Sequence, residues 1–331
     1  MARLSILIPC QGGAAEFDGT LVSVLQHRPA DSEILVLHTQ AYDDPYDLAS
    51  EVTFVRHQAQ GSSLVGLLQT GWKLASAPIV HVLACGLEVE ENWAEPALEH
   101  FDDDEIAAVV PAVMDVPRSR LVSAGLRCTA GGSRRVLRDE RMLLGGSGHL
   151  RAAIQGPTLA AGFYRRDVLE ALEGWDPTAG DSLADVALAL DLQSLQLRTV
   201  LEPASRVVLA SDSRTSTSTS SLAQGRFAER LFWRNAGRVG LLQALAAHPF
   251  AVAADLLAAA PQAGGLPGLL GRALAWAELG SQRRYERRLQ AAGQRLERTR
   301  ATRGATLSLA AARKERIALP MAEPTTGRKA A

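Results

Sequence analysis

Short, continuous runs of apolar residues recur along the first half of the chain, and between them the apolar residues follow helical spacing. The runs predict buried strands, and the stretches between them predict helices. The predicted strands span Leu4–Pro9, Glu33–His38, Thr53–Arg56, Ile79–Ala84 and Ile106–Met114, and the predicted helices span Thr20–His27 and Leu64–Ala75. This alternation is typical of an α/β fold in which helices cover both faces of a mixed, mostly parallel sheet.

In such sheets, ligands bind at the carboxyl ends of the strands. The residues at the ends of three predicted strands are therefore candidates for a binding site. They are Pro9, Cys10 and Gln11 at the first strand, His38 and Thr39 at the second, and Ala84, Cys85 and Gly86 at the fourth.

The stretch from Gly156 to Pro203 predicts a strand followed by two helices. Thr158–Tyr164 is an apolar run that predicts the strand, and Asp167 is a candidate N-cap for a helix that Gly174 ends. A second helix is predicted over Leu183–Leu192, with Asp185 near its start. A carboxylate there is stabilised by the free N–H groups of the first turn, and a catalytic base is the alternative interpretation.

The C-terminal third changes character several times. Arg206–Ala210 predicts the last strand, a Ser/Thr-rich link follows, and Leu222–Ala260 predicts helices. Ala251–Leu279 is apolar but broken by prolines and glycines, so it predicts no uninterrupted membrane-spanning helix. We therefore expect a main domain at 1–210, a link at 211–221, a helical extension at 222–280, a basic helical segment at 281–316 and a disordered tail at 317–331.

Charge is unevenly distributed along the 331 residues, although the formal net charge is only −1. From Ser281 onward there are 13 Lys/Arg and 4 Asp/Glu, which leaves a net charge of −10 for residues 1–280. The arginine-rich segment Ser281–Arg300 could therefore bind an anionic membrane surface. Nucleic acid is not an expected partner, because the body is acidic and Tyr285 is the only aromatic residue among those arginines.

The cysteines favour a reducing compartment. Cys10, Cys85 and Cys128 lie far apart in the sequence and form no CxxC pair, so neither a zinc site nor a disulfide framework is predicted. The apolar run at the N-terminus is too short for a signal peptide. We expect a cytoplasmic protein, with peripheral attachment to the inner face of the membrane as an alternative.

Two halves of the chain resemble the family 2 glycosyltransferases. The resemblance covers about residues 4–240 and implies the GT-A fold, in which a nucleotide-diphospho-sugar is the donor. In the first half it rests on Ser5–Pro9, Gln26, Glu33–Leu37, Asp43, Gly61, Gly71, Ala75 and Leu83. In the second half it rests on Tyr164–Arg166, Gly174–Asp176, Asp185, Leu188, Leu197–Arg198 and Pro203.

The resemblance also implies roles for particular residues. Asp185 matches the family's general base, which deprotonates the acceptor hydroxyl, and Trp175 and Asp176 fall on the acceptor side. The nucleotide-sugar side comprises Pro9, Cys10, Gln11, His38, Thr39, Asp43, Ala84 and Gly86.

Ala84, Cys85 and Gly86 stand where the family has Asp-x-Asp, whose last acid binds the metal. These three residues supply no hard oxygen ligand, so no metal ligand is assigned and the use of Mg²⁺ or Mn²⁺ stays open. Glu88, Glu90 and Glu91 predict a solvated acidic turn, with a role at the phosphates as the alternative. Arg134, Arg135 and Arg138 likewise predict a solvated surface, with phosphate contacts as the alternative.

Two functions follow. The first is inverting transfer of a sugar, of hexosyl type, from a nucleotide-sugar donor to a polysaccharide or lipid-linked acceptor. The second is a catalytically silent relative that binds a glycan or a partner protein during surface-polysaccharide assembly, and the absent metal ligands favour it.

Overall fold

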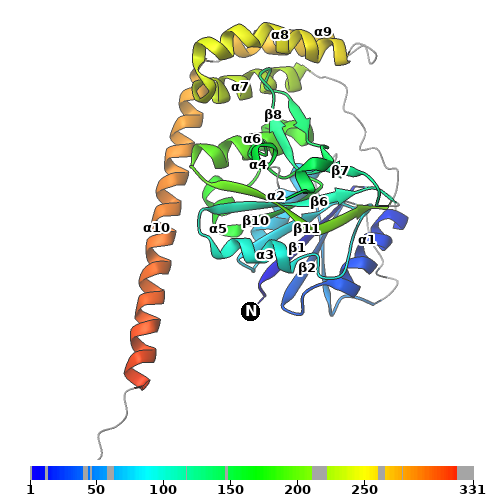
Figure 1. Ribbon diagram of the computed structural model, residues 1–331, viewed down its shortest axis with the longest axis vertical. Coiled ribbons are helices and arrows are strands. Elements are labelled where there is room, and N and C mark those ends of the chain that lie inside the picture. The colour runs from blue at the N-terminus through cyan, green and yellow to red at the C-terminus, as the bar shows by residue number, and fades with distance from the viewer. Residues whose placement is uncertain are drawn as a thin grey trace, which may run out of the picture.

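A computed structural model shows a curled mixed sheet with helices on both faces and a helical extension at one end (Figure 1). It describes residues 2–11, 14–39, 44, 47–57, 63–116, 118–145, 148–210, 222–259, 265–277 and 279–318. In the described residues the sheet has the order β3 (Val52–Arg56), β2 (Ser32–His38), β1 (Leu4–Cys10), β4 (Ile79–Leu83), β10 (Ala161–Arg165), β6 (Ile106–Met114), β11 (Arg198–Leu209) and β5 (Leu87–Val89).

Most of these strands run parallel, which confirms the predicted fold class. β3, β2, β1 and β4 are mutually parallel, and β11 is parallel to β6. β10 lies antiparallel between β4 and β6, and β5 is antiparallel to β11. A short strand, β7 (Leu121–Ser123), pairs with β6, and β8 (Leu126–Cys128) and β9 (Arg134–Val136) form a separate hairpin.

Alternating side chains of the strands feed two cores. In β1, Leu4, Ile6 and Ile8 belong to one core, whereas Leu7 belongs to the other. The first core is covered by α1 (Ala14–His27) and α3 (Glu95–Glu99). The second is covered by α2 (Leu64–Leu74), α5 (Arg166–Leu172) and α6 (Gly180–Ser194). Because both faces are covered, the strands are continuous apolar runs.

Two predicted boundaries around β10 are wrong. The strand begins at Ala161 because Thr158 pairs with Ala161 across a tight turn, and it extends to Arg165. Arg165, not Asp167, is the N-cap of α5, and Asp167 lies in the first turn of that helix. α5 ends at Leu172, where Glu173 and Gly174 adopt left-handed conformations. A Cβ at Gly174 would lie 2.3 Å from Trp72 Nε1, so this position requires glycine.

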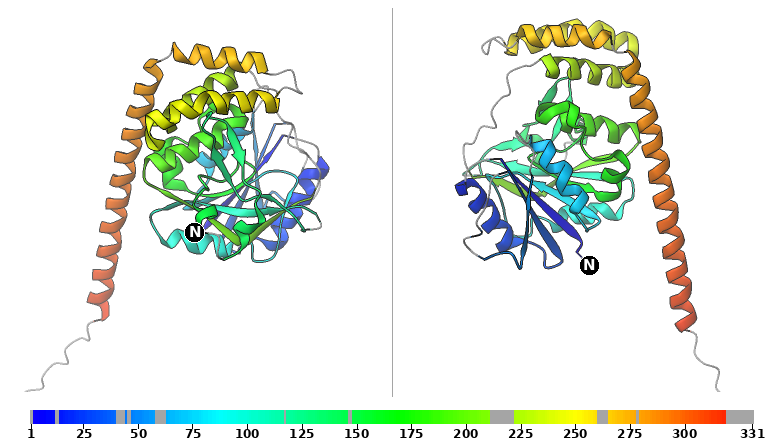
Figure 2. Two further views of the ribbon diagram at one scale, coloured as in Figure 1. Left: turned by 45° about the horizontal axis from the view of Figure 1, so that its top comes forward. Right: turned by 180° about the vertical axis from the view of Figure 1, so that it is seen from behind.

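The C-terminal part consists of α7 (Leu222–Val239), α8 (Leu241–Ala259), α9 (Gly265–Trp276) and α10 (Leu279–Ala318). α7 packs on α6, and α8 and α9 form the layer farthest from the sheet (Figures 1 and 2). None of the helices among the described residues is long and apolar enough to cross a membrane. The predicted domain limits stay predictions, and the link at 211–221 lies outside the described residues, as does the tail beyond 318.

α10 runs along the side of the body (Figure 1) and is fastened to it by polar contacts. The buried Tyr285 donates a hydrogen bond to the buried Asp191 of α6 (2.8 Å), and the Arg234 guanidinium lies 3.9 Å from the centre of the Tyr285 ring. Farther along, Arg288 donates to Leu172 O and Arg295 pairs with Glu173 (2.8 Å). Part of the basic segment is therefore engaged with the body of the protein.

The first prediction concerns His81, which is fully buried in β4 between the rings of Trp93 and Phe163, with centroids at 4.7 and 4.0 Å. Burial lowers the pKa of His81 to about 3. The unfolded chain binds this proton below about pH 6.5, so the neutral ring stabilises the fold above that pH. As the pH falls from about 6.5 towards 3, that stability is lost, about 5 kcal/mol in all.

Replacing His81 with phenylalanine should remove this acid sensitivity, because the aromatic neighbours accept another ring. Urea unfolding at several pH values between 3.5 and 7 would measure it, with the exposed His149→Phe variant as the control. An unchanged slope of stability against pH in His81→Phe would contradict the assignment.

Candidate active site

Three parallel strands end side by side and place their last residues at one edge of the sheet. Cys10 of β1 is the register partner of His38 in β2, and β4 lies on the other side of β1. After β4 the chain turns at Ala84, and Cys85 Sγ comes to 2.8 Å from Cys10 Sγ and 3.4 Å from Pro9 O. These residues thus lie at the same edge of the sheet, as the sequence predicts.

The turn after β4 is tied to α1 through Gly86. Its N–H donates to Thr20 Oγ1 (3.0 Å) and lies 3.3 Å from Glu16 O, and its φ of 85° is left-handed. Glycine adopts that conformation at no steric cost, so the turn can follow the strand directly. The left-handed backbone of Gly86 and the hydroxyl of Thr20 thus fix the shape of this turn.

The link Leu159–Ala160 joins this turn to Asp185. Because β10 is antiparallel to β4, β10 begins at the edge where β4 ends, with Ala161 opposite Leu83. Just before it, Ala160 O accepts the N–H of Ala84 (2.8 Å), and the N–H of Leu159 donates to Asp185 Oδ2 (3.3 Å). Asp185 therefore lies at the carboxyl edge of the sheet.

Asp185 is a buried carboxylate, and its interpretation as a first-turn helix charge is wrong. α6 begins at Gly180, so the first-turn acid is Asp181, which accepts the N–H groups of Leu64 and Val65 at the start of α2 (2.9 Å each). Asp185 accepts from Arg134 Nε (2.8 Å) and from the N–H of Val186 (2.9 Å). Burial raises the pKa of Asp185, and the Arg134 guanidinium opposes that rise.

Arg134 belongs to the hairpin β8–β9 and is exposed, as expected of a solvated surface, but its guanidinium also pairs with the buried Asp185. Its ion pair with Asp185 joins residues 51 positions apart in the sequence. Arg135 and Arg138 are exposed, as expected of a solvated surface. No sequence pattern distinguished Arg134 from Arg135, although their alternation on a short strand sends them to opposite faces.

The other predicted site residues lie in different surroundings, and their roles remain predictions. Gln11 is exposed, Thr39 is half-buried, and the half-buried His38 stands edge-on to Phe54 with ring centroids 6.5 Å apart. Asp43 lies outside the described residues.

On the predicted acceptor side, both side chains are engaged within the protein. Trp175 is fully buried and packs edge-on against Tyr164 (5.3 Å), so it acts on a ligand only through its neighbours. Asp176 accepts from the N–H of Thr178 and pairs with Arg234 and Arg288 (3.9 and 3.8 Å).

The described residues at this edge do not fit a hard divalent cation. Ala84, Cys85 and Gly86 offer a thiol and backbone groups, whereas Mg²⁺ and Mn²⁺ prefer several oxygen ligands. In the described part of the chain, no group of three His, Cys, Asp or Glu side chains is placed to hold a metal. Of the acids after the turn, Glu90 pairs with Arg118 (2.6 Å) and Glu91 is exposed.

Residues 5–169 match the family model of glycosyl transferase family 2. These residues form a glycosyl transferase family 2 domain. Human polypeptide N-acetylgalactosaminyltransferase 9 is 35% identical over 68 residues, which are 20% of this chain and 11% of that protein, and the Macaca fascicularis protein matches equally. The chain thus spans about a tenth of these curated relatives.

Solved structures show the same fold. GalNAc-T7, crystallised with UDP, GalNAc and Mn²⁺, superposes with a TM-score of 0.55 at 15% identity, covering 70% of this chain and 47% of that one. The mannosyltransferase PcManGT of Pyrobaculum calidifontis, in complex with GDP-Man and Mn²⁺, gives a TM-score of 0.53 at 18% identity, covering 89% and 86%. The GT-A fold of the glycosyltransferase family 2 domain is therefore established.

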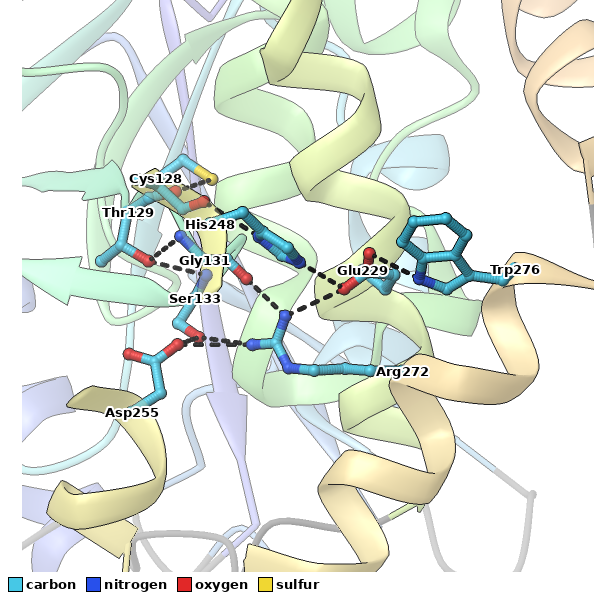
Figure 3. Close-up of polar contacts among 10 residues, drawn as sticks. Cys128, Thr129, Gly131, Ser133, Glu229, His248, Asp255, Arg272 and Trp276 are labelled. Atoms are coloured by element: carbon cyan, nitrogen blue, oxygen red, sulfur yellow. Dashed lines mark hydrogen bonds and ion pairs between the residues drawn. The ribbon is translucent and has the colours of Figure 1, made fainter. Parts of the chain in front are cut away.

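A group of polar side chains around one buried carboxylate fastens the helical extension to the hairpin of this domain (Figure 3). We call Glu229, His248, Asp255 and Arg272 the polar clamp. The buried Glu229 of α7 accepts from Trp276 Nε1 (3.1 Å), and its Oε2 lies 3.1 Å from His248 Nε2 of α8 and 3.3 Å from Arg272 Nη1 of α9. One carboxylate thus holds three groups from two other helices.

The polar clamp reaches the loop between β8 and β9. Arg272 donates to Gly131 O (2.6 Å), and both Arg272 and Asp255 contact Ser133 Oγ (3.3 and 2.5 Å). Gly132 has a φ of 79°, and a Cβ there would lie 1.8 Å from Ala228 O of α7, so the loop touches the helix backbone. Arg134 follows directly, and the extension therefore supports the arginine that pairs with Asp185.

The sequence did not reveal the polar clamp. Its members lie more than ninety residues from the hairpin in the sequence, and only the three on α8 and α9 stood out as isolated charged residues within apolar helices.

We expect that Glu229→Ala destabilises the protein by about 1–3 kcal/mol, because it removes the buried acceptor shared by Trp276, His248 and Arg272, while Asp255 still pairs with Arg272. Urea unfolding measures the loss, and amide hydrogen exchange should show it concentrated in α8 and α9. The exposed Glu297→Ala is the matched control. Equal stability of the two variants would contradict this role.

A further prediction concerns the thiols of Cys10 and Cys85. The hydrogen bond from Cys85, together with burial, raises the pKa of the Cys10 thiol, so the pair should persist as free thiols in neutral buffer. An added azo oxidant such as diamide should take up the two thiol hydrogens and close a disulfide, because the sulfur atoms are already in contact (2.8 Å).

Peptide mass mapping after alkylation in denaturant measures this outcome, with Cys128, which lies elsewhere in the fold, as the internal reference. Cys85→Ser should leave Cys10 alkylatable after the same treatment. Three alkylatable cysteines in the oxidised parent protein would contradict the prediction.

Proposed function

We propose that the protein transfers a sugar from a nucleotide-sugar donor to a polysaccharide or lipid-linked acceptor, with Asp185 as general base. The observation that carries the proposal is the position of Asp185. This carboxylate lies at the carboxyl edge of the sheet, one short link away from the turn Ala84–Gly86. The glycosyltransferase family 2 domain supplies the class of reaction.

In this proposal the acceptor hydroxyl approaches Asp185 at the oxygen that Arg134 now occupies. The carboxylate removes the hydroxyl proton, the oxygen attacks the anomeric carbon, and the nucleoside diphosphate leaves with inversion. Burial raises the pKa of Asp185, which makes it a stronger base than an exposed aspartate. Arg134 keeps the carboxylate ionised until the acceptor replaces it, since its positive charge favours the charged form.

The donor and the location are proposed on separate grounds. Two solved relatives of the same fold were crystallised with UDP and with GDP-Man, so a UDP- or GDP-sugar is the first donor to test. The free thiols favour a cytoplasmic location. The basic residues at the start of α10, Arg283, Arg284 and Arg287, are exposed and favour the inner face of an anionic membrane.

A second candidate function rests on the residues that replace the metal ligands. If Ala84, Cys85 and Gly86 cannot assist departure of the diphosphate, the domain acts as a silent module that binds a glycan or a partner protein in surface-polysaccharide assembly.

Calorimetric titration with UDP, GDP and dTDP and their sugars, with and without Mn²⁺, separates the two candidates. Donor binding supports the enzyme, and a hundredfold excess over Kd should stabilise the fold by about 2.7 kcal/mol. Absence of binding to all of them supports the silent module.

The sharper prediction concerns Asp185→Asn. Loss of the base should lower the transfer rate about 10²- to 10⁴-fold and leave donor affinity unchanged. Asp191→Asn is the matched control, because Asp191 is a buried acid of the same helix that faces Tyr285. Radiolabelled-sugar transfer and donor titration measure the two quantities. Equal rates in both variants would rule out Asp185 as the base.

A pH profile tests the partnership with Arg134. Arg134→Ala removes the charge that opposes the raised pKa of Asp185, so the acidic limb of kcat/KM should move to higher pH. Arg135→Ala, the exposed neighbour, should leave the limb in place.

A further inference from the structure

The outermost layer of the molecule exposes large apolar side chains on both of its helices. On α8 the exposed side chains include Leu242, Phe250 and Leu257, which are 86%, 78% and 76% exposed. On α9 they include Leu266 (75%) and Leu270. The two helices contact each other and lie together at the end farthest from the sheet (Figure 2). We call these five residues the outer face. Contiguous apolar surface of this kind marks an interaction site.

The outer face is apolar because every described charged side chain of α8 and α9 turns inward. His248 and Asp255 of α8 and Arg272 of α9 all belong to the polar clamp (Figure 3). The inner surface of α9 is fixed in addition by close backbone contact, since a Cβ at Gly271 would lie 2.1 Å from Leu222 O of α7. These contacts with the body of the protein set the orientation of both helices. The apolar side of each helix therefore faces outward.

The outer face is bordered by a tryptophan and by arginines. Trp276, half-exposed at the end of α9, donates its indole N–H to Glu229 and leaves its ring edge outside. α10 starts three residues later, and its first turns carry the exposed Arg283, Arg284 and Arg287. At about 1.5 Å per residue, these arginines lie within about 12 Å of the start of α10 along its axis. Tryptophan and arginine next to an apolar helical surface are typical of the membrane interface.

We propose that the outer face docks flat on an anionic lipid bilayer, with Arg283, Arg284 and Arg287 at the headgroups. Charge selects this occupant over a second copy of the chain. A second copy would bring a second set of these arginines and no described acid on the outer face to pair with them, whereas anionic headgroups attract them. α10 runs away from the layer of α8 and α9 along the body (Figure 1), so its later turns lie farther from that layer. Membrane contact is thus assigned to the extension rather than to the whole basic segment.

Flotation of the full chain with lipid vesicles tests the proposal without requiring any enzymatic activity. The chain should float with vesicles of phosphatidylcholine mixed with phosphatidylglycerol, and less with phosphatidylcholine alone. The triple variant Leu242→Ser, Phe250→Ser, Leu257→Ser should reduce the bound fraction at least tenfold. Its matched control is Val22→Ser, Leu74→Ser, Val116→Ser, which changes exposed apolar side chains elsewhere. Circular dichroism verifies that both variants fold.

The charge contribution has its own pair of variants. Arg283→Gln, Arg284→Gln, Arg287→Gln should abolish the preference for anionic vesicles and its sensitivity to salt, whereas Arg135→Gln, Arg138→Gln, Arg298→Gln should retain both. Flotation of the apolar triple variant at the level of the parent chain would overturn the proposal. So would a parent chain that does not float and sediments as a dimer that the apolar variant dissociates, because a second copy would then cover the outer face.

Discussion

Burial of the Asp185 carboxylate is the constraint on which much of this structure depends. A charge removed from water is tolerated only when a partner compensates it, and Asp185 has Arg134 and two backbone N–H groups. Arg134 comes from a hairpin with only a short two-stranded ladder of its own. Its buried Leu126 and Cys128 pack in the same core as α6, and the helical extension in addition contacts its loop.

The polar clamp explains the unusual composition of the extension. Each charged side chain described on α8 and α9 is used to bind Glu229 or the hairpin loop, so none remains on the outer side. Glycines of α7 and α9 bring these helices into backbone contact and leave no room for side chains between them. One arrangement thus supports the site on its inner side and exposes an apolar surface on its outer side.

The sheet could be predicted from sequence because burial on both faces leaves a local trace, an unbroken apolar run such as Leu4–Pro9 or Ile106–Met114. The depth of Asp185 could not, because α6 begins at Gly180 without a capping side chain, and the apolar spacing first becomes regular at Leu183. That hidden first turn made Asp185 look like a helix-terminal charge. Its partner Arg134 was equally hidden, since an ion pair between distant segments leaves no periodicity in either of them.

At the edge of the sheet, the backbone geometry of the strand ends and the side chains needed to bind a metal are two separate properties. The backbone geometry that brings Cys10, His38 and Ala84 together needs only parallel strands of the right length and a glycine at position 86, and all of these are present. Metal binding needs side-chain oxygens, and at the turn a soft thiol against a second thiol stands in their place. The backbone of this edge is therefore kept, while its side chains are not those that a hard cation prefers. Arginine, which carries a permanent charge and reaches this edge from the hairpin, is the residue type through which such a site compensates negative charge, as it already does for Asp185.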